Sequence, residues 1–329
     1  KSPTLLQQSL RQWHPLYDFA QRHGIDHCVL LRFNELQFAL GLYGLSDLSF
    51  TVSGIFPHPF VREEVSGDSP VDWLEAYLGH QRRRFSLRWA IRNPFITNVF
   101  LLNDSKSARA LNETLDPERK RFSTIPDPVF PKAGLGELPS EGVRSRYAFD
   151  ENRQLFLLSG VLSRRKGVLS ALRATMSLNR DAQQQMALLV AGRPSSEIRS
   201  ELEKVVDDVK TNHAVQVRAN FRFLSDPEFE QAFKESDVVL TPYLRSKGSS
   251  GILGHAARNR TPVLGPKDGL IGELIEEYGL GETVEAADVS DVAAGIRTYL
   301  QGRSAPSMEG MKRYVQERTI SAFTSTLLS

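Results

Sequence analysis

Two loops in the second half of the sequence bring glycine together with basic or hydroxyl side chains, each directly after an apolar run. In the first loop, the run 155–158 is followed by Gly160 and then by Arg164, Arg165 and Lys166. Glycine lets a ligand approach the backbone closely, and neighbouring cations can neutralise a diphosphate. The alternative interpretation is a solvated basic loop in front of a helix.

The second loop is rich in small residues. The apolar run 237–240 leads to Tyr243 and then to the turn Lys247-Gly248-Ser249-Ser250-Gly251-Ile252. Consecutive small residues at the start of a helix expose backbone N–H groups, and the helix dipole and the serine hydroxyls favour a phosphate there. The alternative is an ordinary serine N-cap beside a flexible loop.

A third loop, with Arg222, Phe223 and Leu224, precedes the helix signal Asp226-Pro227. All three loops leave the carboxyl ends of predicted strands, where open α/β sheets bind their ligands. One crevice can then combine a phosphate clamp with a flat apolar wall, as a nucleoside diphosphate requires. Neither a Gly-x-Gly-x-x-Gly nor a Gly-x-x-x-x-Gly-Lys-Ser/Thr motif follows a strand, which argues against NAD-binding and P-loop sites.

The elements around these loops alternate between strand and helix. Short apolar runs predict strands at 155–158, 187–190, 215–217, 237–240 and 262–264, separated by helical patterns. This alternation predicts a doubly wound α/β domain with a parallel sheet. The first half reads similarly, with strands predicted at 27–33, 48–53 and 97–102 and helices near 4–23, 71–90 and 105–114. Proline and glycine are dense from 125 to 150, which predicts a linker and a domain boundary near residue 150.

The stretch 155–280 resembles the donor domain of GT-B glycosyltransferases, in the large group that includes family 4. The matching pieces, in family order, are Ser159-Gly160 with Lys166-Gly167, Leu189-Val190-Ala191-Gly192, Arg222-Phe223-Leu224, 237–243, 248–251 and 260–264. Upstream of this stretch, Ile125-Pro126-Asp127-Pro128 resembles the family's entry into the interdomain linker. The resemblance implies two Rossmann-like, doubly wound domains facing a central cleft. The first (1–150) would take the acceptor, although the family's N-terminal glycine-rich loop is not recognisable there. The second (151–307) would bind the nucleotide-sugar donor, and a final helix (308–329) would pack back on the first domain.

The resemblance also implies residue roles. The donor diphosphate would contact Gly160, Arg164, Arg165, Lys166, Ser249, Ser250 and Gly251. The donor nucleoside and sugar would contact Arg222, Phe223, Leu224, Tyr243, Lys247, Ile252 and His255. The family's pair of glutamates, seven residues apart, falls on Lys247 and His255. The second glutamate usually holds the donor ribose, so His255 would have to replace that contact. These departures leave the donor sugar and the stereochemical outcome open.

The function implied is transfer of a sugar from a nucleotide-diphosphate sugar, a UDP-sugar being favoured, to a carbohydrate or lipid-linked glycan acceptor in polysaccharide or glycoconjugate synthesis. Retention of configuration is expected, with no metal ion or other cofactor. The alternative is a weak or inactive GT-B protein that binds a nucleotide sugar; a related epimerase or phosphorylase also stays open. His58, after the predicted strand 48–53, is a candidate for proton transfer, or else a loop histidine without a catalytic role.

The stretch 82–92 contains five arginines and no acidic residue, interleaved with Phe85, Leu87, Trp89 and Ile91. It could contact an anionic membrane or a lipid-diphosphate acceptor, or form a basic solvated face. The net charge of +2 does not indicate a nucleic-acid partner, and the single cysteine, Cys28, excludes an intrachain disulfide. We expect a cytoplasmic protein, free or held at the inner face of the membrane.

Overall fold

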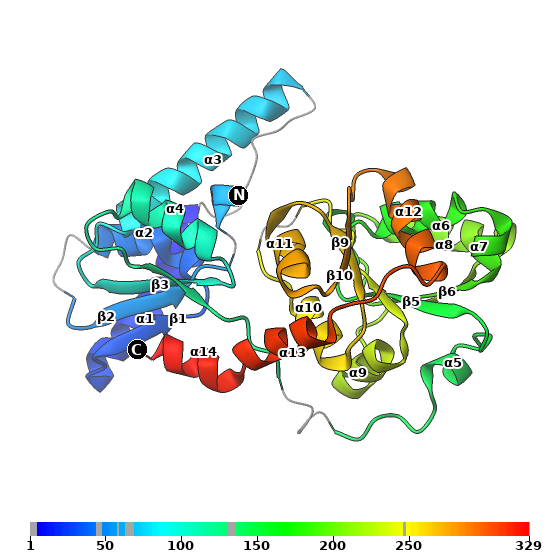
Figure 1. Ribbon diagram of the computed structural model, residues 1–329. Helices are drawn as coiled ribbons and strands as arrows, with labels where there is room; N and C mark the ends of the chain where they lie inside the picture. The colour runs from blue at the N-terminus through cyan, green and yellow to red at the C-terminus, as the bar shows by residue number, and fades with distance from the viewer. Residues whose placement is uncertain are drawn as a thin grey trace. The chain divides into compact units, whose positions relative to one another are not determined.

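The computed structural model describes residues 5–43, 48–57, 59–62, 69–130, 136–245 and 248–328. The chain forms two compact units (Figure 1). The first comprises residues 1–126 with 247–249 and 325–329, and the second comprises 127–246 with 250–324. The second unit therefore starts earlier than residue 150. The reason is that Val143 and Phe149 are buried in its core, so this proline- and glycine-rich stretch is packed structure.

The second unit is a six-stranded parallel sheet. Its strands are β5 (Gln154–Ser159), β6 (Met186–Ala191), β7 (Gln216–Asn220), β8 (Val238–Leu240), β9 (Val263–Pro266) and β10 (Gly281–Val284). They lie in the order β10-β9-β8-β5-β6-β7, and every pair is parallel. The strand order reverses between β5 and β8, which confirms the predicted doubly wound α/β class and places the topological switch point at these two strands.

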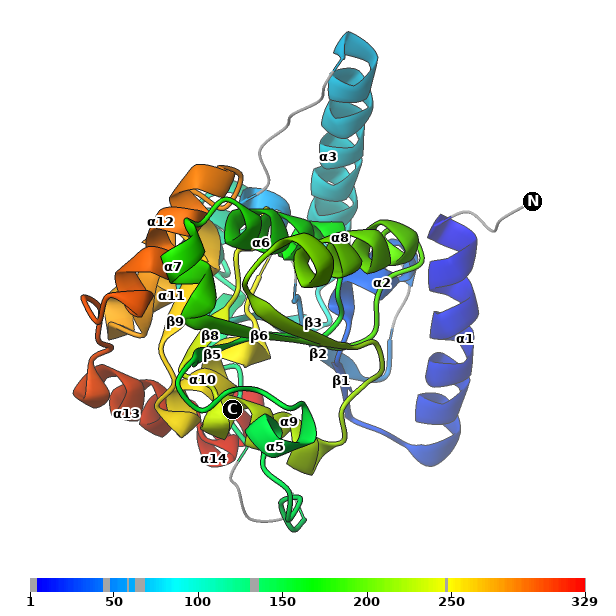
Figure 2. The same ribbon diagram turned by 90° about the vertical axis from the view of Figure 1, so that its right-hand side faces the viewer.

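Helices cover both faces of this sheet. The helices of this unit are α5 (Val143–Arg146), α6 (Val168–Met176), α7 (Arg180–Gln184), α8 (Arg199–Asn212), α9 (Asp226–Glu235), α10 (Gly251–Asn259), α11 (Gly269–Tyr278), α12 (Val289–Leu300) and α13 (Met308–Glu317). The last helix, α14 (Ile320–Leu327), has residues in both units. Figure 2 shows α6 and α8 on one face and α9 and α10 on the other. Successive side chains of β5 point to opposite faces, so Phe156 packs in the core under α6 and α8, and Leu157 packs in the core over α10.

The predicted final helix is two helices. α13 packs on α10 and α11. It ends at Glu317 with Arg318 as its C-cap, and α14 begins at Ile320. The Arg318 guanidinium carbon lies 3.9 Å from the Tyr314 ring centroid and 4.6 Å from that of Tyr278. The carbonyl of Arg318 accepts a hydrogen bond from the Val129 amide at 2.7 Å. Arg318 therefore ties the end of α13 to α11 and to the start of the second unit.

The first unit contains a smaller parallel sheet whose strands follow chain order: β1 (His27–Leu30), β2 (Thr51–Ile55), β3 (Ile96–Leu102) and β4 (Phe122–Ile125). Its helices are α1 (Leu5–His23), α2 (Phe33–Tyr43), α3 (Pro70–Ala90) and α4 (Ser105–Leu115), with a short 3-10 turn, η1 (Phe60–Arg62). The core gathers around the fully buried Trp13 and Phe33. Asp104 caps α4 by accepting a hydrogen bond from the Ser107 amide at 3.0 Å.

No helix in the described parts of the chain combines the length and the apolar character that crossing a bilayer demands.

Candidate functional site

The loop that follows β5 is held against the two neighbouring strand ends by glycines in the left-handed region. Gly160 has φ +103° and its amide donates to the Ala191 carbonyl at 3.1 Å. A Cβ on Gly192 would lie 1.8 Å from the Gly160 carbonyl oxygen, so only glycine lets these two loops meet. After the 3-10 turn Arg164–Lys166, the chain enters α6 through Gly167, with φ +67°.

The same loop contacts the segment that follows β8. A Cβ on Gly167 would lie 1.8 Å from the Pro242 carbonyl oxygen. The Leu244 amide donates to the Arg165 carbonyl at 2.9 Å, and Arg165 Nη1 donates to the Arg245 carbonyl at 3.3 Å. The two loops at the switch point are therefore in direct backbone contact.

Side chains from both loops gather at the start of α10. Lys166 Nζ lies 5.2 Å from the ring centroid of Tyr243, and the hydroxyl of that tyrosine lies 3.3 Å from Ser250 Oγ. A Cβ on Gly160 would lie 3.1 Å from Lys166 Nζ and 4.0 Å from Ile252 Cδ1. Residues predicted from separate loops thus form one group, which we call the Lys166 cluster: Gly160, Lys166, Tyr243, Ser250 and Ile252.

The Lys166 cluster can attract an anion. Arg165 adds a second cation, its guanidinium carbon 5.8 Å from the Tyr243 ring centroid. Ser250 is the N-cap residue of α10, yet its side chain accepts no capping hydrogen bond from the described part of this helix. A Cβ on Gly251 would meet no atom within 4 Å, so there is space beside the first turn. Positive side chains and the amide end of a helix around such space suit a diphosphate.

Two of the predicted diphosphate-binding residues, Arg164 and Ser249, have partners outside this cluster. Arg164 pairs with Glu201 of α8 at 2.8 Å, away from Tyr243. Ser249 Oγ accepts a hydrogen bond from Asn103 Nδ2 at 2.9 Å. His58 and Lys247 lie outside the described residues, so their roles stay predictions.

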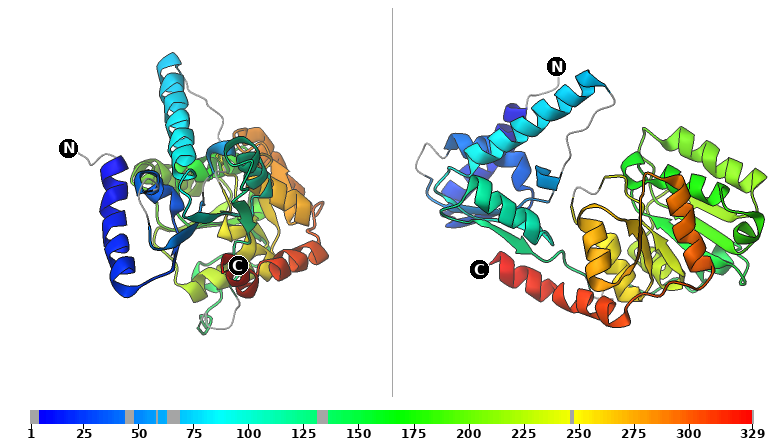
Figure 3. Two further views of the ribbon diagram at one scale, coloured as in Figure 1. Left: turned by 90° about the vertical axis from the view of Figure 1, so that its left-hand side faces the viewer. Right: turned by 45° about the horizontal axis from the view of Figure 1, so that its top comes forward.

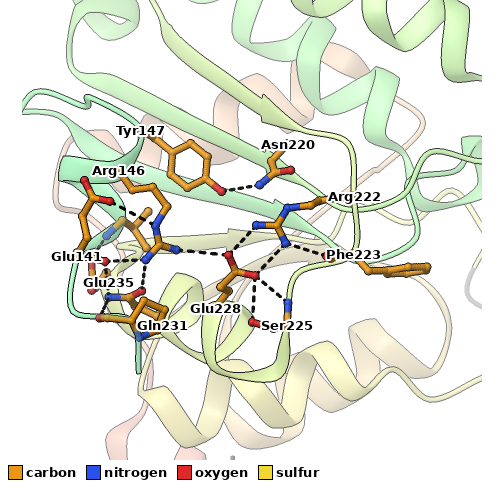
Figure 4. A network of polar contacts seen from close by, with 12 residues as sticks. Glu141, Arg146, Tyr147, Asn220, Arg222, Phe223, Ser225, Glu228, Gln231 and Glu235 are labelled. Carbon is orange, nitrogen blue, oxygen red and sulfur yellow. Dashed lines mark hydrogen bonds and ion pairs between the residues drawn. The ribbon is translucent and has the colours of Figure 1, made fainter. Parts of the chain in front are cut away.

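The loop after β7 is fixed by an ion pair. Arg222 donates to both carboxylate oxygens of Glu228, at 2.9 and 2.6 Å, and the Ser225 amide donates to the same carboxylate at 2.9 Å (Figure 4). The hydrogen bonds from Arg222, and then the one from the Ser225 amide, lower the pKa of Glu228 to about 2. Arg222 therefore holds the loop, while the Phe223 side chain is 56% exposed and Leu224 packs on the core.

Residues of the stretch 139–149 extend this network, and they are absent from the sequence prediction. Arg146 lies 3.8 Å from Glu228, on the side opposite Arg222 in Figure 4, and also donates to Gln231 at 3.2 Å. The hydroxyl of Tyr147 accepts from Asn220 Nδ2 at 2.8 Å, at the end of β7. The signal in the sequence is weak: basic and aromatic residues scattered among prolines and glycines.

His255 faces α9. Its ring centroid lies 4.9 Å from that of Phe229 and 5.4 Å from that of Phe233. Its Nδ1 lies 3.6 Å from Glu230 Oε2 and 3.1 Å from Arg258 Nη2. Glu230 is 2% exposed. Burial alone would raise the pKa of Glu230, but hydrogen bonds from His255 and other α10 side chains, together with the Arg258 charge, lower it to about 2. The imidazole is thus part of a charged contact between two helices.

Comparisons with known proteins support the fold predicted from the sequence. Residues 140–318 match the model of the family described as glycosyl transferases, group 1. No curated protein sequence matches the chain. Among solved structures, a UDP-forming trehalose-phosphate synthase of Burkholderia xenovorans is similar with a TM-score of 0.73 and 15% identity, over 97% of this chain and 77% of that one. Its counterpart in Burkholderia vietnamiensis gives 0.70 and 15%, over 97% and 75%. HepE of Anabaena, in complex with UDP, gives 0.67 and 16%, over 98% and 83%. These likenesses show the two-domain, Rossmann-like GT-B fold.

Proposed function

Because the chain belongs to the group 1 glycosyl transferases, we propose that its second unit binds a UDP-sugar and that the enzyme transfers the sugar to a glycan or lipid-linked glycan, in polysaccharide or glycoconjugate synthesis. The observation that carries this proposal is the Lys166 cluster, which joins two loops at the switch point of a doubly wound sheet. The choice of UDP is supported by the similar HepE structure, which holds UDP.

In the proposed mechanism the donor diphosphate lies against Lys166, Arg165 and the first turn of α10. When the bond between the sugar and the phosphate breaks, negative charge grows on the departing UDP. Lys166, Arg165 and the amides at Gly251 stabilise that charge because they are already in place. Gly160 leaves room for the phosphate to approach. We propose that no metal ion is required, since these groups supply the positive charge, and that the configuration of the sugar is retained.

The nucleoside would lie against the loop after β7. The exposed ring of Phe223 offers a flat apolar surface, and the backbone beside Leu224 offers amide and carbonyl groups to a base. Arg222 acts on this site through its pairing with Glu228, which fixes the loop. His58 stays the candidate for proton transfer.

Calorimetry of UDP binding tests the phosphate site directly. We expect the full chain to bind UDP with the same affinity in the presence of EDTA and in the presence of added magnesium ions. Lys166→Met should weaken UDP binding by about 1–3 kcal/mol, which is roughly five- to 150-fold, as for a lost charged hydrogen bond. The matched control is Lys204→Met, on the exposed side of α8, which should bind UDP as the native chain does. Equal affinities of the two variants would remove Lys166 from the site.

A second candidate function is nucleotide-sugar binding without transfer. It is favoured by His255, which stands where the family pattern has a ribose-binding glutamate and is engaged by Glu230. Release of UDP from UDP-sugars, measured with and without a panel of glycan acceptors, separates the two. UDP binding with no release under any condition would select the second candidate over the first.

A further inference from the structure

Helix α3 exposes an unusual amount of apolar surface. Its exposed large apolar side chains are Val71, Trp73, Leu74, Tyr77, Leu78 and Phe85. Each is between 39% and 66% exposed. The rings of Trp73 and Tyr77 stack on one another, with centroids 5.3 Å apart and an interplanar angle of 10°. Water thus contacts aliphatic and aromatic groups along the first two turns of α3 and again at Phe85.

These six side chains lie on one side of the helix. At 100° per residue they fall within an arc of about 160°. Ser86, Leu87 and Ala90, which are buried against the first unit, fall on the opposite side. In Figures 1 and 3 the first turns of α3 extend away from the other elements of the first unit. The arc therefore faces outward, and the unit's own core does not account for it.

In the second half of α3 the charges around this arc are all basic. Arg82 and Arg84 fall at its two edges and Arg88 falls within it, and all three are exposed. No aspartate or glutamate occurs between Glu75 and Asp104. The acidic residues of the first turns, Asp72 and Glu75, fall outside the arc.

We propose that α3 docks on an anionic membrane surface, with its apolar arc at the level of the lipid headgroups and its arginines on the lipid phosphates. An interfacial helix has this composition: aromatic and aliphatic groups on one face, basic groups at its margins. Tryptophan and tyrosine favour the membrane–water interface because one end of each ring system is polar. The proposal does not depend on glycosyl transfer.

The charge pattern favours a lipid surface over a protein partner. The centre of a protein–protein interface is depleted in charged residues, whereas here arginines border the apolar arc and one lies inside it. Arginines gain about 1 kcal/mol each from a nearby anionic leaflet, an attraction that adds to apolar burial. Residues 82–90 of the basic stretch are thus the C-terminal part of a longer docking helix, which begins at residue 70.

The test is flotation of the full chain with vesicles of phosphatidylcholine alone or with one quarter phosphatidylglycerol. We expect binding to the anionic vesicles and little binding to the neutral ones. Arg82→Gln/Arg84→Gln/Arg88→Gln should weaken anionic binding on the order of a hundredfold. Leu74→Ser/Leu78→Ser should abolish binding to both kinds of vesicle. Both variants should keep the native far-UV spectrum and melting temperature, because the changed side chains are exposed.

Two further measurements sharpen the test. Phe19 on α1 is an aromatic side chain about as exposed as Trp73 and Phe85 of α3. The control variant Phe19→Ser should therefore bind vesicles as the native chain does. Tryptophan emission should shift to shorter wavelength on binding, and Trp73→Phe should remove most of that shift while binding persists. No binding to anionic vesicles, or binding that α3 variants leave unchanged, overturns the proposal. So does a native dimer that Leu74→Ser/Leu78→Ser dissociates without any vesicle binding, since the arc would then be covered by a second copy.

Discussion

Gly167→Ala tests whether contact between the two switch-point loops builds the donor site. Gly167 has φ +67°, and an added Cβ would lie 1.8 Å from the Pro242 carbonyl oxygen. An alanine can be accommodated only if the backbone of one loop moves. That movement would separate Lys166 from Tyr243 and from the start of α10. We therefore expect Gly167→Ala to lower both stability and UDP affinity.

The chain supplies a matched control that separates backbone strain from steric overlap. Gly302 has φ +64°, and a Cβ there would meet nothing within 4 Å. Gly302→Ala should therefore cost about 1 kcal/mol, the price of a left-handed alanine. Gly167→Ala should cost that plus about 1–3 kcal/mol for overpacking, or about 2–4 kcal/mol in all. UDP affinity should fall at least about tenfold in Gly167→Ala, as a displaced loop loses a charged contact, and stay unchanged in Gly302→Ala.

Urea unfolding can be followed by two probes that report different units. All three tryptophans, at 13, 73 and 89, lie in the first unit, so their emission follows that unit. Far-UV circular dichroism follows both. We expect Gly167→Ala to lower the midpoint of the dichroism transition and to leave the tryptophan transition nearly in place. If Gly167→Ala and Gly302→Ala lose the same stability and bind UDP equally, the loop contact is not what shapes the site.

Three other predictions address α9 and its neighbours. Glu228→Gln should lose about 2–3 kcal/mol at pH 7, because the pKa of Glu228 falls from 4.5 to about 2 on folding. That stabilisation is present above pH 4.5 and is lost as the pH falls toward 2, so the two melting curves should converge in acid; Glu203→Gln, at an exposed ion pair, is the control and should change little at any pH. Phe223→Ala should weaken UDP binding about tenfold with an unchanged melting temperature, since the ring is 56% exposed; unchanged calorimetric affinity would move the base elsewhere. His255→Glu should destabilise the chain by at least about 1 kcal/mol in thermal melts, because it places a second carboxylate near Glu230; a more stable variant would show that the histidine is not the partner of that acid.

The fold of the second unit is largely predictable from the sequence because its strands are buried on both faces. Runs such as 155–158 and 187–190 are continuously apolar, so their identity as strands does not depend on knowing which face is inside. In the first unit, α2 and β4 escape prediction. α2 is apolar around most of its circumference, which blurs the helical period, and β4 has only four residues. The predicted strand from residue 27 also ends at Leu30, since Phe33 already begins α2.

The candidate site is predictable where glycine and loop order determine it. Gly160 and the turn at 248–251 fall at strand ends by chain order alone, and the doubly wound topology then makes their loops neighbours. The direction of a long side chain is not encoded in that order. Arg164 and Lys166 are two residues apart, yet Arg164 turns to Glu201 and Lys166 to Tyr243. Likewise, Arg222 is basic and near a predicted base site, but Glu228 engages it.

α9 contacts both the loop after β7 and helix α10, which the sequence motifs describe separately. Its first-turn Glu228 holds Arg222 and the loop after β7, while Glu230, on another face, contacts Arg258 and His255 of α10. A carboxylate at residue 255 would lie close to the buried Glu230, and the two like charges would repel one another. A histidine at 255 avoids that repulsion and accompanies Arg258 beside the acid at 230. The departure from the family's glutamate pattern is then a local change of charge between two helices, and it does not by itself remove the proposed phosphate site at the start of α10.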